Sequence, residues 1–354
     1  MSTDNLSRRE FIKKTSAATA GTIVAASAAL ADDNKKKKEE PVDTSKILNY
    51  NEKMEYRRFG KTNLMISAVS MGGHWKRVDV MNQELEKNRY DVVSKLIDSG
   101  INYIDACWGG EVMIYSQALK GRRDKMYLAL SNGSKEPRNK EYRTAKKLLE
   151  SLDELLLDSG QEYTDFWRIT ALEPGGRHSF DTCCEIVAAL DKAKQQGKAR
   201  FGGFSTHDRR WIKFMVEYFP QIDAVCFPYT AMSKKAPKGS LFTALKEHDV
   251  GAFGIKPFAS NSLFKGDSSP GNPNSEEDDR RARMALRYIL YSTDIVPIPG
   301  LINDHQVDNV LKAIEERREQ DLMGNMELET PVESDEAWAS LPSNYQWLKD
   351  WEYV

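Results

Sequence analysis

Four side chains able to exchange protons or bind metals lie at or just past the ends of short apolar runs in this sequence. They are His74, Asp105, Cys107 and His207. Imidazole titrates near neutral pH, so His74 and His207 are candidate catalytic proton donors, and the Asp105 carboxylate could orient such a donor. The same residue types can also ligate zinc, but their spacing matches no metal-binding motif, and we predict no metal ligands.

The four positions belong to a repeated pattern. Eight apolar runs occupy residues 69–73, 102–106, 126–131, 164–172, 199–205, 224–229, 251–258 and 295–300. Eight segments of helical periodicity follow them in turn, at residues 84–99, 112–120, 140–157, 180–196, 209–218, 240–248, 279–291 and 304–315. Strands alternating with helices predict a parallel sheet, and eight units in about 250 residues predict an α/β fold of the (β/α)8 TIM-barrel type. No G-x-G-x-x-G follows the first run, which argues against a Rossmann fold.

Smaller elements flank this repeat. Residues 56–59 and 64–67 predict an N-terminal β-hairpin of the kind that closes the bottom of some barrels. Residues 266–279 form a polar insert rich in Pro and Gly, and such loops at the C-terminal face of a barrel usually carry function or are disordered. We place the barrel at residues 55–316 and expect the C-terminal tail, residues 317–354, to pack on it through its aromatic side chains.

The first 31 residues resemble a secretory leader. Arg8 and Arg9 precede Glu10 and Phe11, an apolar stretch of small residues follows, and the segment ends in Ala-Leu-Ala. This order is similar to that of a twin-arginine signal peptide, which predicts a passing interaction with the twin-arginine translocase and a periplasmic or otherwise exported protein. Residues 32–54 are polar and predict a solvated linker. No later run is long enough to cross a membrane, so we expect a soluble protein after removal of the leader.

Composition narrows the range of partners. The 354-residue chain is 40% hydrophobic and 29% charged, as in ordinary globular proteins, and its formal net charge is −2. A mildly acidic protein gains nothing from neutralising phosphates, so a nucleic acid partner is not expected and a small-molecule ligand is. Four cysteines in a chain of this size do not make a disulfide framework, and we expect free thiols.

Seven short motifs together resemble one enzyme family. They are residues 56–62 (YRRFGKT), 100–106 (GINYIDA), 118–123 (ALKGRR), 197–200 (GKAR), 202–205 (GGFS), 256–258 (KPF) and 298–300 (IPG). Their order is similar to that of the aldo/keto reductases. The resemblance implies a barrel that binds NADP(H) at its C-terminal mouth and passes hydride between the nicotinamide and a carbonyl. A tyrosine assisted by a lysine and an aspartate would donate the proton, and a histidine would orient the substrate.

The catalytic residues implied by this resemblance are mostly missing. Asp105 stands where the family aspartate belongs, but Trp108 or Gly110 stands in place of the tyrosine. Ser131 occupies the place of the lysine, and Thr170 that of the histidine. The unperturbed pKa of a phenol is about 10, so the family's tyrosine depends on its lysine, and losing both indicates a different proton donor. We therefore predict Asp105, His74 and His207 as the catalytic residues.

No nearby side chain replaces the missing ones cleanly. Tyr103 lies two residues before Asp105 and deeper in the barrel, whereas Tyr115 lies on the following helix. Lys135 comes four residues too late in the chain to replace the lysine.

Cofactor-binding positions survive better. The resemblance assigns cofactor contacts to Ser205, Thr206, Cys226, Lys256, Pro257, Gly300, Gln306 and Asn309. Of these, Gly300, Gln306 and Asn309 lie around a predicted helix N-terminus, which favours anions. Residues 301–306 contain no Arg or Lys that could bind a 2′-phosphate, so NADP and NAD both stay open, either tightly bound or absent altogether.

Three functions follow from these observations. The first is an exported oxidoreductase that acts on a small carbonyl, alcohol or sugar with a nicotinamide cofactor and a non-standard proton donor. The second is a catalytically silent barrel that binds a nucleotide or sugar. The third is a metal-dependent barrel enzyme, since a fold does not fix a function.

Overall fold

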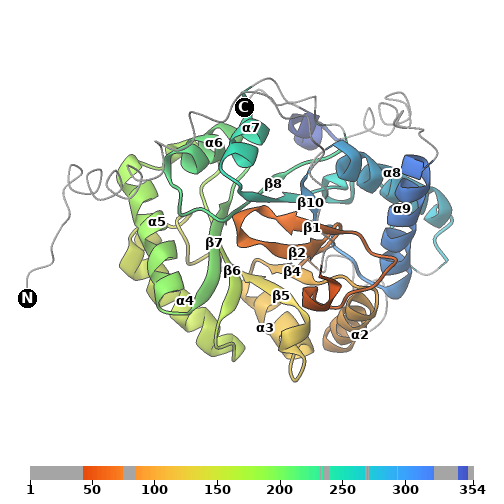
Figure 1. Cartoon of the computed structure of the whole chain (residues 1–354), viewed down its shortest axis with the longest axis horizontal. Helices are drawn as coiled ribbons and strands as arrows, with labels where there is room; N and C mark the ends of the chain where they lie inside the picture. Colours follow the sequence, from red (N-terminus) through yellow and green to blue (C-terminus); the bar gives the residue numbers. More distant parts are fainter. Residues whose placement is uncertain are drawn as a thin grey trace, which may run out of the picture. The chain divides into compact units, whose positions relative to one another are not determined.

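The computed structural model describes residues 43–74, 84–231, 233, 239–267, 269, 271–292, 294–322 and 342–349. Eight parallel strands run around one sheet in chain order, which confirms the predicted (β/α)8 barrel (Figure 1). The strands are β3 (Met71–Gly72), β4 (Tyr103–Ala106), β5 (Tyr127–Leu130), β6 (Thr164–Thr170), β7 (Ala199–Ser205), β8 (Ala224–Pro228), β9 (Gly251–Ile255) and β10 (Val296–Pro297).

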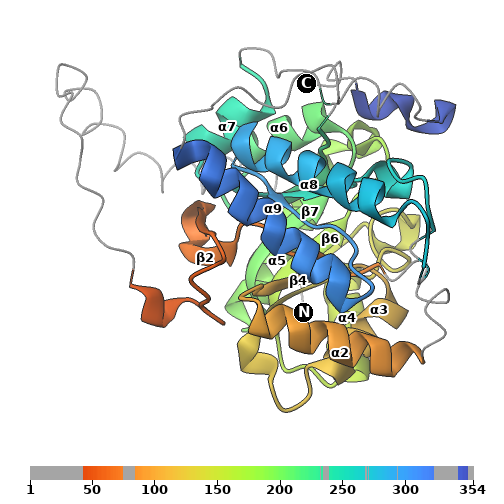
Figure 2. The same ribbon diagram turned by 90° about the vertical axis from the view of Figure 1, so that its right-hand side faces the viewer.

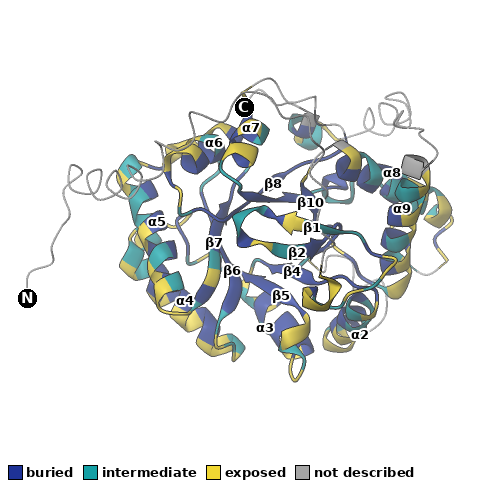
Figure 3. Cartoon of the chain, viewed as in Figure 1, coloured by how far each residue is buried: buried dark blue, intermediate teal, exposed yellow. Residues whose placement is uncertain are grey.

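Helices surround the sheet on its outer side. They are α2 (Leu85–Asp98), α3 (Gly109–Ala118), α4 (Ala145–Ser159), α5 (Phe180–Gln195), α6 (Arg209–Tyr218), α7 (Leu241–Glu247), α8 (Ser275–Ser292) and α9 (Asp304–Leu322). Viewed from the side, α8 and α9 lie next to each other, with α2 beyond α9 (Figure 2). The strands are buried almost throughout, whereas the helices expose one face, as the sequence periodicity predicts (Figure 3).

Backbone contacts between the first and last strands nearly close the barrel. The amide of Ser70 donates to the carbonyl of Pro297 over 3.1 Å, and the amide of Gly72 donates to Pro299 over 2.8 Å. A Cβ atom on Gly72 would lie 2.5 Å from the carbonyl oxygen of Ile298, so this approach requires glycine.

The predicted hairpin is present, and it closes the N-terminal end of the barrel. Its strands β1 (Tyr56–Phe59) and β2 (Leu64–Ser67) pair antiparallel and lie across the barrel in Figure 1. Phe59 stacks on Phe253 with ring centroids 4.2 Å apart, and Phe253 stacks in turn on Tyr103 at 4.0 Å. This apolar plug keeps water from the barrel interior on one side and leaves the C-terminal mouth as the place for a site.

Several boundaries differ from the predicted ones. α8 begins at Ser275 instead of residue 279, because Glu276, Glu277 and Asp278 form an acidic first turn that suits the positive end of a helix. α4 begins only at Ala145, where the Thr144 hydroxyl caps it by accepting from the Lys147 amide. The last barrel helix continues past residue 316, to Leu322.

Part of the predicted linker packs on the barrel instead of being solvated. Met54 is buried, and the Asn51 side-chain amide donates to the carbonyl of Asp98 over 3.1 Å. The leader, residues 1–31, lies outside the described residues, as does most of the tail. No helix in the described part of the chain is both long and apolar enough to span a membrane. All four cysteines are free thiols.

Candidate active site

A buried ion pair crosses the barrel just below its C-terminal mouth. Arg168 on β6 donates from Nε and Nη2 to the two carboxylate oxygens of Asp105 on β4, each over 2.6 Å. Both side chains are less than 10% exposed. The two parallel hydrogen bonds satisfy both charges away from water, which is the condition for a buried pair to be tolerated. Asp105 is thus bound to an arginine on the neighbouring part of the barrel wall.

Arg168 was not predicted from the sequence, because the resemblance pointed to Thr170 at the strand end. A signal was present, since an arginine within a buried seven-residue strand requires a buried anionic partner. Residues two apart on a strand face the same side, so Arg168 and Thr170 both point to the interior of the barrel.

Tyr103 also contacts the pair and is excluded as the acid. Its hydroxyl donates to Asp105 Oδ2 over 3.2 Å. Burial, reinforced by the neighbouring Asp105 carboxylate, raises the pKa of Tyr103 well above its usual value, which opposes ionisation of the phenol.

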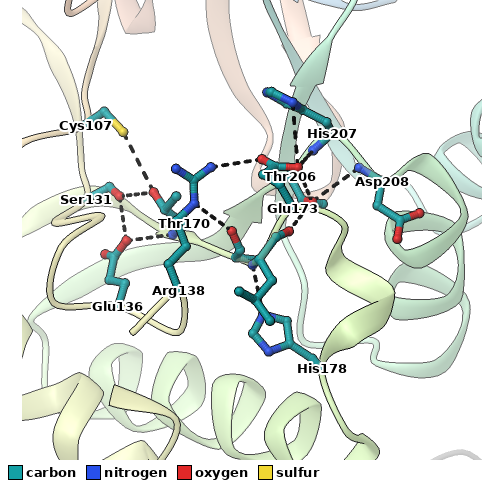
Figure 4. Close-up of polar contacts among 12 residues, drawn as sticks. Cys107, Ser131, Glu136, Arg138, Thr170, Glu173, His178, Thr206, His207 and Asp208 are labelled. Carbon is teal, nitrogen blue, oxygen red and sulfur yellow. Dashed lines mark hydrogen bonds and ion pairs between the residues drawn. The ribbon is translucent and has the colours of Figure 1, made fainter. Parts of the chain in front are cut away.

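A hydrogen-bonded network lies at the ends of β5 and β6, around Ser131 and Thr170 (Figure 4). The Ser131 hydroxyl and the Thr170 amide both donate to Glu136 Oε2, over 2.8 and 2.7 Å, and the Asn132 amide donates to Oε1 over 2.9 Å. The hydroxyls of Ser131 and Thr170 are 2.6 Å apart. Cys107 extends the network toward the mouth, its Sγ 3.8 Å from the Thr170 hydroxyl oxygen.

Glu136 is the centre of this network and was not foreseen from the sequence. Only 1% of the residue is exposed. Burial raises the pKa of its carboxyl group, while the two amides, the Ser131 hydroxyl and nearby Arg168 oppose that rise. The Glu136 carboxylate has three hydrogen-bond donors of its own and needs no ammonium partner.

His74, predicted as catalytic, contacts a carboxylate, as histidines that act in acid–base catalysis commonly do. Its Nδ1 is in hydrogen-bond contact with Glu111 Oε1, while Glu111 Oε2 accepts from the Cys107 amide over 2.9 Å. The Glu111 side chain is only 8% exposed, whereas that of His74 is 53% exposed. A Cβ atom on Gly73 would come within 3.0 Å of Glu111 Oε2, so this glycine leaves room for the carboxylate. A buried carboxylate therefore orients an accessible imidazole.

His207 is in a different environment. Its backbone amide donates to Glu173 Oε2 over 2.6 Å, and its ring stacks on Trp347 with centroids 4.9 Å apart. Burial, helped by the charges of Lys256 and Arg138, lowers the pKa of His207 from 6.5 to about 3. The ring stays neutral near neutral pH, so His207 is a poor proton donor there. Glu173 also accepts from the Thr206 hydroxyl and from Arg138 (Figure 4).

The residues at and near the positions where the resemblance implies a catalytic tyrosine supply no proton donor. Trp108 precedes α3 with 41% of its surface exposed, and Gly110 lies in the first turn of that helix. Tyr115 is fully buried; burial raises its pKa to about 12, although Arg89 opposes the rise. Lys135 lies on the exterior in contact with Glu154.

The predicted cofactor positions fall into two groups. Ser205 ends β7, Thr206 follows it, and both are buried; the Thr206 hydroxyl donates to the carbonyl of Leu172 over 2.8 Å. Cys226 is the register partner of Ser205 on β8 and belongs to the barrel core, where burial raises its pKa far above the usual range. Lys256 has a left-handed backbone with φ 59° and leads, through Pro257, into the turn after β9.

The second group lines a cavity of about 600 Å³, which we call the α8–α9 cavity. Gly300, Gln306 and Asn309 all contribute to it. The cavity lies between residues 300–303, the N-terminal halves of α8 and α9, and one side of α2. Ser269, Gly271 and Asn272 of the polar insert also line it.

Comparison with known proteins agrees with this architecture. The model of the aldo/keto reductase family matches residues 68–283. The chain belongs to the aldo/keto reductase family. Membership supports its assignment as a nicotinamide-linked oxidoreductase of small carbonyl compounds. In the described part of the chain, no three His, Cys, Asp or Glu side chains are grouped to hold a metal ion.

Individual relatives are distant. L-galactose dehydrogenase from Arabidopsis thaliana is 25% identical over 295 residues, which cover 75% of this chain and 89% of the plant protein. Among solved structures, the holo form of aldo-keto reductase AKR11C1 from Bacillus halodurans has a TM-score of 0.60 at 19% identity, covering 84% of this chain and all of that one. An aldo-keto reductase from Klebsiella pneumoniae in complex with NADPH has a TM-score of 0.58 at 17% identity, covering 82% and 96%.

We predict that Arg168→Met lowers the free energy of unfolding by about 3 to 5 kcal/mol, because it leaves the Asp105 carboxylate buried without its partner. The matched control is Arg58→Met, which breaks an Arg–Asp pair whose side chains are about half exposed and should cost about 1 kcal/mol or less. Urea unfolding measures both. Adding Asp105→Asn to Arg168→Met should restore part of the loss, and strictly additive losses would contradict a coupled pair.

We also predict that the protein loses stability as pH falls from about 6.5 toward 4. Burial lowers the pKa of His178 from 6.5 to about 4, so the unfolded chain takes up a proton that the folded chain refuses, at a cost of up to about 3 kcal/mol. His207 contributes with the same sign. His178→Gln, which keeps an acceptor for the Leu172 amide, should flatten the pH profile of unfolding, and partly exposed His248→Gln should not. An unchanged profile in His178→Gln would be the contrary result.

Proposed function

We propose that the protein is an exported, nicotinamide-linked oxidoreductase of small carbonyl or alcohol substrates in which His74, oriented by Glu111, exchanges the proton. The contact between His74 and Glu111 at the end of β3 carries this proposal. Of the three residues predicted as catalytic, Asp105 is neutralised by Arg168, and His207 is covered by Trp347. His74 is the more accessible of the two histidines, with 53% of its side chain exposed against 31% for His207, and its contact with Glu111 is shorter than the 3.7 Å between His207 Nδ1 and Glu173 Oε2.

A nicotinamide cofactor, when bound, supplies or accepts the hydride in this chemistry. Ser205 and Thr206 would hold its carboxamide end, and Gly300, Gln306 and Asn309 would hold its adenosine end. The α8–α9 cavity supports this fit, because it has amide side chains and an apolar wall beside a helix N-terminus. Cys226, which is the register partner of Ser205 in the sheet and as buried as Thr206, would lie at the same end.

Proton transfer follows from the orientation of His74. With Nδ1 directed at Glu111, this nitrogen carries the hydrogen and Nε2 is left to face the substrate. In the oxidation of an alcohol, Nε2 accepts the hydroxyl proton while the buried carboxylate stabilises the resulting imidazolium. In the reverse direction, Nε2 returns the proton to the forming alkoxide.

The substrate is expected to be a small polyol or sugar. The similarity to a plant L-galactose dehydrogenase supports a hydroxyl or hemiacetal carbon as the hydride donor. Cys107 and His74 are both partly exposed at this end of the barrel.

A silent, ligand-binding barrel is the second candidate. The closed network of Ser131, Thr170 and Glu136 favours it, because these residues satisfy one another and present no charged group in place of the family lysine. Under this alternative the protein binds a nucleotide but transfers no hydride.

Turnover assays with His74 variants separate the two candidates. We expect His74→Ala to lower kcat about 100-fold or more, as for the loss of a general acid–base group, with partial rescue by added imidazole. Glu111→Gln should lower kcat less and shift its pH profile, whereas His248→Ala, at the end of α7, should act as wild type. The assay follows nicotinamide absorbance with aldoses and aldehydes. Undiminished turnover in His74→Ala would remove this residue from the mechanism, and cofactor binding without any turnover would support the silent barrel.

Export rests on the leader sequence alone. Expressed as the full chain in a bacterium with a twin-arginine pathway, the protein should reach the periplasm in a shortened form. Replacing Arg8 and Arg9 together by Lys should retain it in the cytoplasm, while replacing Lys35 and Lys36 by Arg should not. Cell fractionation and mass spectrometry provide the readout, and cytoplasmic wild-type protein of full length would count against export.

A further inference from the structure

We infer that the α8–α9 cavity selects the unphosphorylated adenosine of NAD(H) and rejects the 2′-phosphate of NADP(H) by charge. The inference rests on the proposed function, since it concerns the cofactor that this oxidoreductase would use. It concerns only the adenosine end of that cofactor, which residues of α2, α8 and α9 around the cavity would contact.

The charge of the cavity lining has one sign. Four carboxylates contribute to it: Asp91, Asp278, Asp279 and Asp304. No lysine or arginine lines the cavity in the described part of the chain. A phosphomonoester carries nearly two negative charges at neutral pH, so these carboxylates would repel it, least of all Asp91, which is paired with Lys87 over 2.5 Å.

Three cations near the cavity are each paired with a carboxylate. Lys95 pairs with Asp308 over 2.7 Å, Arg281 pairs with Glu277 over 2.8 Å, and Arg283 pairs with Glu316 over 2.9 Å. None of these three cations lines the cavity. The lining does include His305, but its Nε2 lies 2.6 Å from Asp279 Oδ2, so even a protonated ring would be offset by that carboxylate.

Asp304 is the decisive carboxylate. It is exposed in the first turn of α9, where unpaired amides and the helix dipole would otherwise attract an anion. The dipole is equivalent to about half a positive charge, so a full negative charge on Asp304 reverses the local preference. By contrast, the Asp278 carboxylate already accepts from the amides of Lys265 and Gly266, over 2.7 and 2.8 Å, and serves to hold the insert.

The remaining lining suits a neutral nucleoside. Phe258, Val92 and Leu286 provide an apolar wall for a base, and Asn303 and the carboxylates can accept hydrogen bonds from ribose hydroxyls. An acidic residue at the ribose and an arginine at the 2′-phosphate are the two general solutions for NAD and NADP. This chain has residues for the first solution only.

Fragment binding tests the inference without any redox step. Calorimetry on the full chain compares ADP with adenosine 2′,5′-bisphosphate, which place a hydroxyl and a phosphate, respectively, at the 2′ position. We expect ADP to bind about tenfold or more tightly at low salt, with the ratio shrinking as salt screens the exposed carboxylates. NADH and NADPH, followed by quenching of tryptophan fluorescence, should show the same order.

Charge reversal identifies the residue responsible. Asp304→Arg should bring the ADP preference close to unity or invert it, and Asp304→Asn should lie between that variant and wild type. Glu315→Arg makes the same change on an exposed position of the same helix outside the cavity and should keep the wild-type ratio. Equal or tighter binding of the bisphosphate by wild type, or no binding of either fragment, would overturn the inference. A preference for ADP in a protein without turnover would support it while contradicting the proposed activity.

Discussion

The ion pair between Asp105 and Arg168 is the constraint on which the rest of the site depends. A buried ion pair of this kind is stable only if the carboxylate oxygens and guanidinium nitrogens are hydrogen-bonded to each other and water is excluded. The stacked rings of Phe59, Phe253 and Tyr103 exclude water from beneath the pair. The pair in turn ties β4 to β6 across the intervening β5, so the strand ends that carry Cys107 and Thr170 have fixed positions.

Arg168 neutralises Asp105 inside the barrel, so any acid–base group there lies beside a fixed ion pair. A buried phenol beside that carboxylate would be a weaker acid than a free one, as Tyr103 illustrates. Under the proposed function, proton exchange takes place nearer the rim, where His74 reaches both solvent and Glu111. The α8–α9 cavity borders this region, because Gly300 lines the cavity and a Cβ atom on it would lie 2.9 Å from the carbonyl oxygen of His74.

The fold was predictable because it depends on periodicity, and alternating apolar runs and amphipathic segments specify a barrel almost regardless of individual residues. The sequence motifs marked strand ends, as at Asp105 and Ser205, whose roles stay predictions. Arg168 was missed because its partner is 63 residues away, and Glu136 because a loop residue that folds back onto its own strand end leaves no periodic signal. His207 was predicted from its residue type, but the type does not reveal that Trp347, from the distant tail, covers the ring. The start of α8 was missed because its acidic first turn resembles a solvated loop.

The network around Glu136 also constrains how this sequence can change. A single Ser131→Lys replacement would remove a donor from Glu136 and bring a second cation toward Arg168, while leaving Thr170 and the position of the missing tyrosine unchanged. A change at Ser131 is therefore coupled to Glu136, Thr170 and Arg168, and the local hydrogen bonding favours keeping these residues together.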